Sequence, residues 1–134
     1  DGSLNHCKKL TKDLNLPIIF PGLLQKKEWI ELSKDYNIFI NTTNFDNMPV
    51  SVMEAMALGM PVISTNVGGM PFLIDNKENG VLVPANNAEA FVDAITELCN
   101  NPEKVKNLTQ NARIKMEGFD WENIKHNWIK LLEV

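Results

Sequence analysis

The sequence predicts an α/β fold in which a parallel β-sheet is covered by helices on both faces. Short, fully apolar segments alternate with amphipathic helical stretches along the chain. Apolar strands of this kind are typical of parallel sheets that are buried on both sides. Helix limits are also marked, because Pro49 and Gly59 bracket one helix and Asn101-Pro102 begins another. Together these observations indicate the Rossmann-like class.

The first part of the chain is expected to alternate helix and strand. Leucines spaced three and four apart predict a helix over Leu4 to Leu14. The apolar run Pro17 to Gly22 ends in a Pro-Gly turn and predicts a short buried strand. A second helix is expected over Lys26 to Tyr36, and the run Tyr36 to Ile40 predicts another buried strand.

A helix is then expected from Pro49 to Leu58. Asp46 or Asn47, in the polar loop that precedes it, can cap its first amides. Pro49 suits the first helical position, and Gly59 suits the left-handed position after the last turn.

Glu54 is the acid of most interest in this helix. The only other polar residue between the helix limits is Ser51, so the helix is predicted to lack a broad solvated face. Glu54 is therefore expected to be an acid on a largely buried helix. An ionised carboxylate there is costly unless it meets hydrogen-bond donors, which are either protein groups or the hydroxyls of a ligand.

The middle of the chain continues the alternation of strands and turns. Pro61 to Thr65 predicts a buried strand, and Asn66 to Gly69 a flexible loop. Met70 to Ile74 predicts a single helical turn that Pro71 starts. Asn79-Gly80 provides a turn before the strand Val81 to Val83.

The last third is expected to be helical. Two helices are indicated by apolar stripes, one at Ala88, Phe91, Val92, Ile95 and Leu98, and one at Val105, Leu108 and Ala112. Asp120 is expected to cap a closing helix over about residues 120–133. Its inward-facing residues are predicted to be Trp121, Ile124, Trp128 and Leu131.

Composition excludes several classes of protein. The 134 residues are 44% hydrophobic, which fits one globular domain with a real core. A net charge of −4, with lysines scattered among acids, argues against a nucleic-acid partner. No apolar run approaches the roughly 20 residues of a membrane span. Cys7 and Cys99 are too few for a disulfide framework or a metal cluster, so a cytoplasmic protein is expected.

Ligands of such sheets bind where loops leave the carboxyl ends of the strands. Three loops qualify here, namely Pro21 to Gln25, Asn41 to Met48 and Asn66 to Met70. In the last of these, the Gly68-Gly69 pair either lets the backbone approach a ligand closely or simply permits the turn.

The start of the Pro49 helix is the candidate binding site. The amides of Asn47, Met48 and Val50, together with the helix dipole, suit a phosphate or another anion. Asp46 opposes a bare anion but can bind sugar hydroxyls; the alternative is that it is only a cap. Glu54 can accept two hydrogen bonds from a ribose, the alternative being an acid satisfied by a backbone or lysine partner.

The stretch DNMPVSVMEAMALGMPVISTNVGGMPFLI, followed by NGVLVP, closely resembles the donor-binding region of retaining glycosyltransferases of the GT-B fold, the "glycosyltransferases group 1" family. That family has an acid, seven residues and a second acid that opens E-A-M-A-x-G-x-P-V, then a G-G-x-P-E loop and an N-G-x-L-V strand. Asp46 and Glu54 have this spacing. FDWENIKHNWIKLL also resembles the family's closing helix.

The resemblance implies the C-terminal donor-binding part of an enzyme that moves a glycosyl group from a nucleotide diphosphate sugar to a saccharide or lipid-linked acceptor, with retention of configuration. Glu54 would hold the ribose, Asp46 would lie against the donor sugar, and the amides of Asn47, Met48 and Val50 would meet the sugar or diphosphate. The resemblance implies no metal and no cofactor besides the donor substrate. The departing diphosphate would help to deprotonate the acceptor on the same face of the sugar.

The sequence departs from the family pattern at three points. Asp46 replaces the commoner Glu, Phe72 stands where Glu is usual, and no segment resembles the Arg and Lys that grip the diphosphate. Asp1-Gly2 resembles the loop that ends the second strand of the family's donor domain. We therefore expect a single, N-terminally truncated domain that lacks the acceptor domain, is inactive alone, and can self-associate through unpaired sheet edges.

Two other functions fit the same residues. One is a non-catalytic nucleotide- or sugar-binding module, which an upstream sequence without the Arg and Lys pair would favour. The other is a GT-B enzyme that is not a transferase, such as a sugar-nucleotide epimerase or a phosphorylase.

Overall fold

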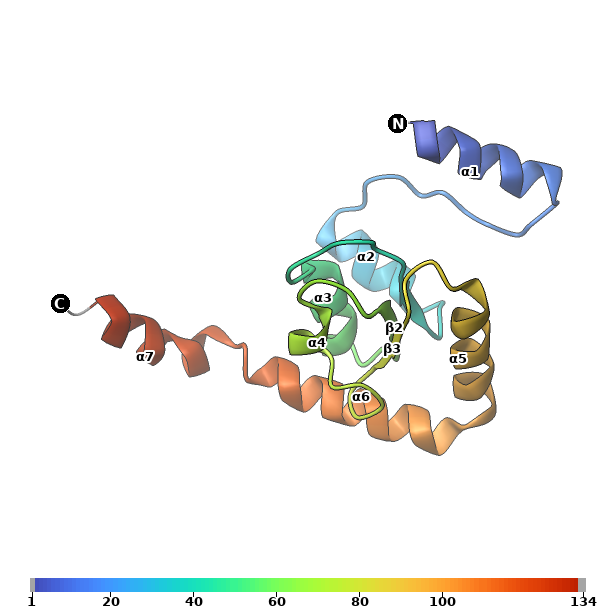
Figure 1. Ribbon diagram of the computed structural model, residues 1–134. Helices are drawn as coiled ribbons and strands as arrows, with labels where there is room; N and C mark the ends of the chain where they lie inside the picture. The colour runs from blue at the N-terminus through green and yellow to red at the C-terminus, as the bar shows by residue number, and fades with distance from the viewer. Residues whose placement is uncertain (1, 133–134) are drawn as a thin grey trace. The chain divides into compact units, whose positions relative to one another are not determined.

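A computed structural model describes residues 2–132 (Figure 1) and divides the chain into two compact units, Asp1–Leu32 and Ser33–Val134. The first unit contains helix α1 (Gly2–Asp13), and helix α2 (Lys26–Ser33) ends at the boundary. The second unit contains the sheet and the remaining helices: β1 (Phe39–Asn41), α3 (Val50–Ala57), β2 (Val62–Thr65), α4 (Met70–Leu73), β3 (Val81–Val83), α5 (Ala88–Asn100), α6 (Pro102–Glu117) and α7 (Trp121–Leu132).

The sheet is parallel, with the strand order β1-β2-β3. Ile63 of β2 lies opposite Ile40 of β1 and Val81 of β3. All four residues of β2 are buried, as expected for a central parallel strand. Helix α3 contacts β1 and β2, whereas α5 contacts β2 and β3, and Figure 1 shows the sheet between these two helices. The predicted Rossmann-like α/β class is confirmed.

Alternation along the strands divides the core between the two faces. Ile63, Val81 and Val83 form one cluster with Ala94 and Leu98 of α5 and with Leu108 of α6. On α3, the buried residues are Val52, Ala55 and Met56, and α6 packs against both α3 and α5. Burial of each large apolar side chain stabilises the fold by about 1.5–3 kcal/mol. These contacts fix α3 and α5 against the sheet within the second unit.

Helix α3 differs from the prediction in two respects. Pro49 is the N-cap residue rather than the first helical residue, and neither Asp46 nor Asn47 caps the helix, because no side chain bonds to its first amides. The helix also has an exposed side, since Val50 is 66% exposed and Ser51 is exposed as well. The predicted end is confirmed, because Gly59 follows the helix with φ +78°.

The strand predicted over Pro17 to Gly22 is wrong. These residues have no strand structure, and Ile19 is 72% exposed. A strand forms only where a neighbouring segment takes up its amides and carbonyls, and no described segment pairs with this one. The run is apolar, as a buried strand would be, but an apolar composition does not supply the neighbouring strand that pairing requires.

Two boundaries and one buried position also differ from prediction. Helix α2 ends at Ser33 rather than Tyr36, and β1 begins only at Phe39 and is partly exposed. Helix ends fray, so the residue at which an element ends is not fixed by the local apolar pattern and depends on tertiary packing. On α5, Leu98 is buried as predicted, but Val92 is 60% exposed, and Ala94, which lies outside the predicted stripe, is buried instead.

The closing helix is correctly placed but does not bury its apolar residues. Asp120 caps α7, since its carboxylate accepts a hydrogen bond of 2.9 Å from the amide of Glu122. No described residue of α7 is buried, and the predicted inward-facing residues Trp121 and Trp128 are 62% and 54% exposed. The amphipathic pattern predicted the helix but not a covering surface for it.

No helix among residues 2–132 has the length and apolar character to cross a membrane.

A polar cluster ties the loop after α4 to α6. Lys115 donates to a carboxylate oxygen of Asp75 at 2.7 Å, and the buried amide of Asn79 donates to the same oxygen at 2.7 Å. Asn79 also accepts from the amide of Asp75 at 2.9 Å. The hydrogen bond from Lys115, reinforced by the one from Asn79, holds the pKa of Asp75 below its ordinary value of 3.8 despite partial desolvation.

The lowered pKa predicts a pH-dependent contribution of this cluster. A depressed carboxylate pKa stabilises the fold above pH 3.8, and the effect is lost as the pH falls through the lower folded-state value. Because Asp75 is half exposed, Lys115→Met should lower the free energy of unfolding at pH 7 by no more than about 1 kcal/mol. At pH 2 the variant and the parent should unfold alike in urea. Lys106→Met, an exposed lysine of the same helix, is the control, and an equal loss at both pH values would contradict this account.

Candidate functional site

The loop between β1 and α3 is held at both of its ends. At the start, the Thr65 hydroxyl at the end of β2 donates to the carbonyl of Thr43 at 2.5 Å. At the other end, the amide of Gly69 donates to the carbonyl of Asp46 at 2.8 Å. Two of the loops predicted to form the site are therefore joined at the carboxyl edge of the sheet.

The close approach of these two loops requires both glycines. A Cβ atom at Gly68 would overlap the carbonyl oxygen of Asp46, and one at Gly69 would overlap that of Asn47. Gly68 also has φ +53°, which side chains of L-residues rarely adopt. The glycine pair thus allows a close approach to the backbone of another loop of the protein, which was neither of the two alternatives that the sequence suggested.

The beginning of α3 presents a group of free donors. No hydrogen bond among the described residues involves the backbone amides of Asn47, Met48, Val50 or Ser51. Asn47, Met48, Val50 and Ser51 are exposed residues. The positive end of the α3 dipole lies at the same place. This arrangement is suited to an anion or to polar oxygens of a ligand.

Both predicted acids belong to this region. Asp46 is half-buried beside Gly69, to which its own carbonyl is bonded. Glu54 lies one turn beyond Val50 on α3 and is half-buried, rather than buried as expected, because α3 has an exposed side. Residues four apart share a helix face, so Glu54 lies on the same side as the exposed Val50. A carboxylate in this position is accessible to a ligand bound at the start of the helix.

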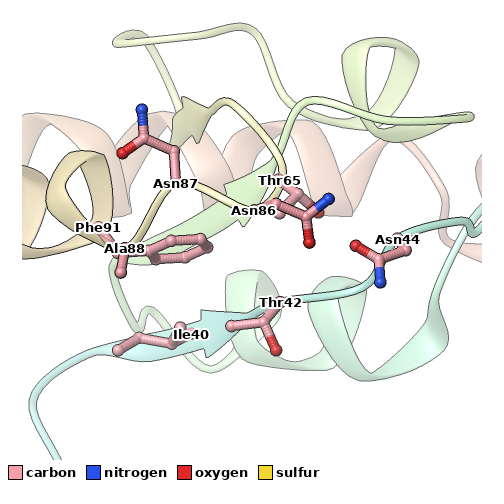
Figure 2. Close-up of a pocket in the computed structure, with 8 residues that line it drawn as sticks. All are labelled: Ile40, Thr42, Asn44, Thr65, Asn86, Asn87, Ala88 and Phe91. Atoms are coloured by element: carbon pink, nitrogen blue, oxygen red, sulfur yellow. The ribbon is translucent and has the colours of Figure 1, made fainter.

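A pocket of about 500 Å³ opens beside the loop, also at the carboxyl ends of the strands. Figure 2 shows Asn44 and Asn86 extending toward each other across it, with the Phe91 ring on one side and Ile40 below. It is lined by Ile40, Thr42, Asn44, Thr65, Asn86, Asn87, Ala88 and Phe91.

The sequence analysis missed the part of this pocket that follows β3. Asn86 has φ +56°, and the Asn87 side chain caps α5 by accepting from the amide of Ala90 at 3.0 Å. The rule that ligands lie beyond the carboxyl ends of parallel strands applies to this loop as much as to the others. The same rule therefore predicts a ligand contact in the loop after β3, which was not among the predicted loops.

The third predicted loop, Pro21 to Gln25, belongs to the other compact unit. Leu23 in this loop is fully exposed. Within residues 2–132, no group of three or more His, Cys, Asp and Glu side chains could hold a metal ion.

A three-stranded parallel sheet with α3 on one face and α5 on the other has the architecture of a Rossmann-like domain of the GT-B glycosyltransferases. The chain belongs to the family described as "Glycosyl transferases group 1", whose profile matches residues 2–115.

Individual relatives agree with this assignment. An uncharacterized glycosyltransferase from Haemophilus influenzae is 33% identical over 97 residues, which make up 72% of this chain and 28% of the relative. Sucrose-phosphate synthase from Thermosynechococcus elongatus superposes with a TM-score of 0.85 at 28% identity, over 97% of this chain and 33% of that one. HepE from Anabaena, solved in complex with UDP-glucose, shares the fold with a TM-score of 0.86 at 20% identity, over 96% of this chain and 36% of that one. The chain thus spans about a third of the length of these proteins.

The glycine contact gives a direct prediction. In Gly69→Ala, the new methyl group displaces the Asn47 carbonyl and breaks the hydrogen bond from residue 69 to Asp46. We expect the amide of residue 69 to exchange with solvent about tenfold faster, as measured by hydrogen-exchange NMR. Gly59→Ala is the control, because it has a positive φ but a Cβ there would meet only Arg113 Cδ at 3.7 Å. Unchanged exchange at residue 69 would show that the contact is not restrictive.

Proposed function

We propose that this chain is the donor-binding part of a glycosyltransferase that uses a nucleotide diphosphate sugar and transfers the glycosyl group with retention of configuration. The observation that carries the proposal is the set of unbonded amides at Asn47, Met48 and Val50, at the positive end of α3. Membership of the glycosyl transferases group 1 family and the UDP-glucose complex of the Anabaena protein support the choice of ligand.

In this proposal each group at the site has one role. The free amides bind oxygens of the diphosphate or of the donor sugar. Glu54 accepts hydrogen bonds from the ribose hydroxyls, and Asp46 lies against the donor sugar. Gly68 and Gly69 act indirectly, since they hold the backbone of Asp46 and Asn47 in place.

Transfer would proceed on one face of the donor sugar. The bond from the anomeric carbon to the diphosphate breaks, and the bond to the acceptor oxygen forms on the same face. The acceptor proton passes to an oxygen of the departing diphosphate. The acceptor is a saccharide or a lipid-linked acceptor.

Charge on the diphosphate is incompletely neutralised by this part of the protein. The sequence contains no Lys, Arg or His between Lys34 and Lys77, the segment that includes both loops and α3. Amides and a helix dipole compensate partial charge only. The proposal therefore assigns the cations that grip the diphosphate to residues outside this segment.

Glu54 provides the first test. Glu54→Gln keeps the size of the side chain but replaces two charge-assisted hydrogen bonds with weaker ones, so the affinity for UDP should fall at least tenfold. Isothermal titration calorimetry with UDP, GDP and ADP measures this loss and identifies the preferred base. Glu103→Gln, at an exposed acid of α6, is the matched control. If no nucleotide binds, or if Glu54→Gln binds as tightly as the parent, the role of Glu54 is wrong.

The missing cations provide the second test. We expect the 134-residue chain alone to transfer sugar no faster than the buffer control when UDP-glucose and a mixture of mono- and oligosaccharides are supplied, with product detected by mass spectrometry. A full-length protein that carries this chain should show transfer under the same conditions. Robust transfer by the 134-residue chain would refute the expectation that this chain is inactive alone.

A further inference from the structure

The pocket between β1 and α5 differs in chemistry from the site at the start of α3. Its lining contains amide, hydroxyl, aromatic and aliphatic side chains, and none of the lining residues is ionisable. Its volume of about 500 Å³ is within the range of pockets that hold small molecules. A site without charge favours an uncharged ligand, all the more in a chain with a net charge of −4.

Two amides in the pocket are available to a ligand. Among the described residues, no hydrogen bond involves the side chain of Asn44 or of Asn86, and Figure 2 shows their carboxamides facing each other, one on the loop after β1 and one on the loop after β3. Each carboxamide offers two donors and one acceptor oxygen. Hydroxyl groups also donate and accept, so a pair of opposed carboxamides suits adjacent hydroxyls on one ring.

The backbone around these amides is fixed before any ligand arrives. Asn86 is held with φ +56°, and the next residue, Asn87, is committed as the cap of α5. On the other side, the bond from Thr65 to Thr43 anchors the segment that carries Thr42 and Asn44. Because these bonds already fix the loops, ligand binding costs little conformational entropy of the loops.

An apolar surface completes the pocket. The Phe91 ring packs partly against the core cluster and also lines the cavity, as does Ile40 of β1. An aromatic ring presents a flat apolar face, which matches the C–H face of a pyranose ring. The pocket therefore combines polar groups with an apolar surface, which are the two kinds of surface that a sugar presents.

From these features we propose that the pocket binds one uncharged sugar unit, at a site separate from the donor groups at Glu54 and the start of α3. Asn44 and Asn86 bond to its hydroxyls, and Phe91 and Ile40 contact its apolar face. An anionic sugar is disfavoured because the pocket offers no cation.

NMR titration of the isotopically labelled 134-residue chain tests the proposal. The probes are the methyl α-glycosides of glucose, galactose, mannose and N-acetylglucosamine, with glucose 6-phosphate as the anionic comparison. We expect at least one neutral glycoside to shift the amides of Thr42, Asn44, Ala88 and Phe91 in a saturable way. Glucose 6-phosphate should shift them less at equal concentration.

Substitutions locate the effect. Asn86→Gly removes the carboxamide without backbone strain, because glycine adopts a positive φ freely, and should weaken binding about fivefold. Asn15→Gly makes the same change at φ +48° in the other unit and should leave binding unchanged. The double variant Asn44→Ala/Asn86→Gly should lose saturable shifts. Absence of shifts with all four glycosides, persistence in the double variant, or equal response to glucose 6-phosphate would overturn the proposal.

The same samples separate this proposal from the donor site. UDP should affect the amides at the start of α3, and Glu54→Gln should weaken UDP binding but not glycoside binding. Loss of UDP binding in every sample would count against the donor site only, and loss of glycoside binding would count against the pocket only.

Discussion

The site depends on a contact between two pieces of backbone. Gly68 and Gly69 approach Asp46 and Asn47 so closely that no side chain fits between them, and one amide-to-carbonyl bond of 2.8 Å closes the contact. Through it, the loop after β2 fixes the loop after β1, and this second loop sets where α3 begins. Because Gly68 and Gly69 have no side chains, this contact can form, and it positions the free amides at the start of α3 and the acid at Glu54.

Elements with partners close in sequence were predictable, and those without partners were not. β2, β3, α5 and α6 pack against each other in one core, so their apolar patterns translate directly into burial. The run Pro17 to Gly22 and the α7 tryptophans have equally apolar patterns but remain exposed in the described chain. A pattern measures the tendency of a segment to be buried, whereas burial needs a second surface that the pattern does not specify.

The candidate site shows the same division. The motif around Glu54 identified the loop, the helix and the glycine pair, because each reflects a local backbone requirement. It did not predict that Pro49 would take the N-cap position or that Val50 would be exposed, since both depend on how α3 lies on β1 and β2. No motif marks Asn86, so its place in the pocket follows only from the rule that ligands lie beyond the carboxyl ends of parallel strands, applied to the loop after β3.

The two sites are suited to different parts of a glycoside, one to charged groups and the other to uncharged groups. Amides, a helix dipole and carboxylates lie at the start of α3, where charged and strongly polar groups are recognised. Across Asn44, on the other side of the same loop, the pocket has no ionisable lining residue. Both sites share the β1–α3 loop, and the Thr65 and Gly69 bonds hold that loop at its two ends. Because these two bonds fix the loop before any ligand arrives, each site keeps its geometry whether or not the other is occupied.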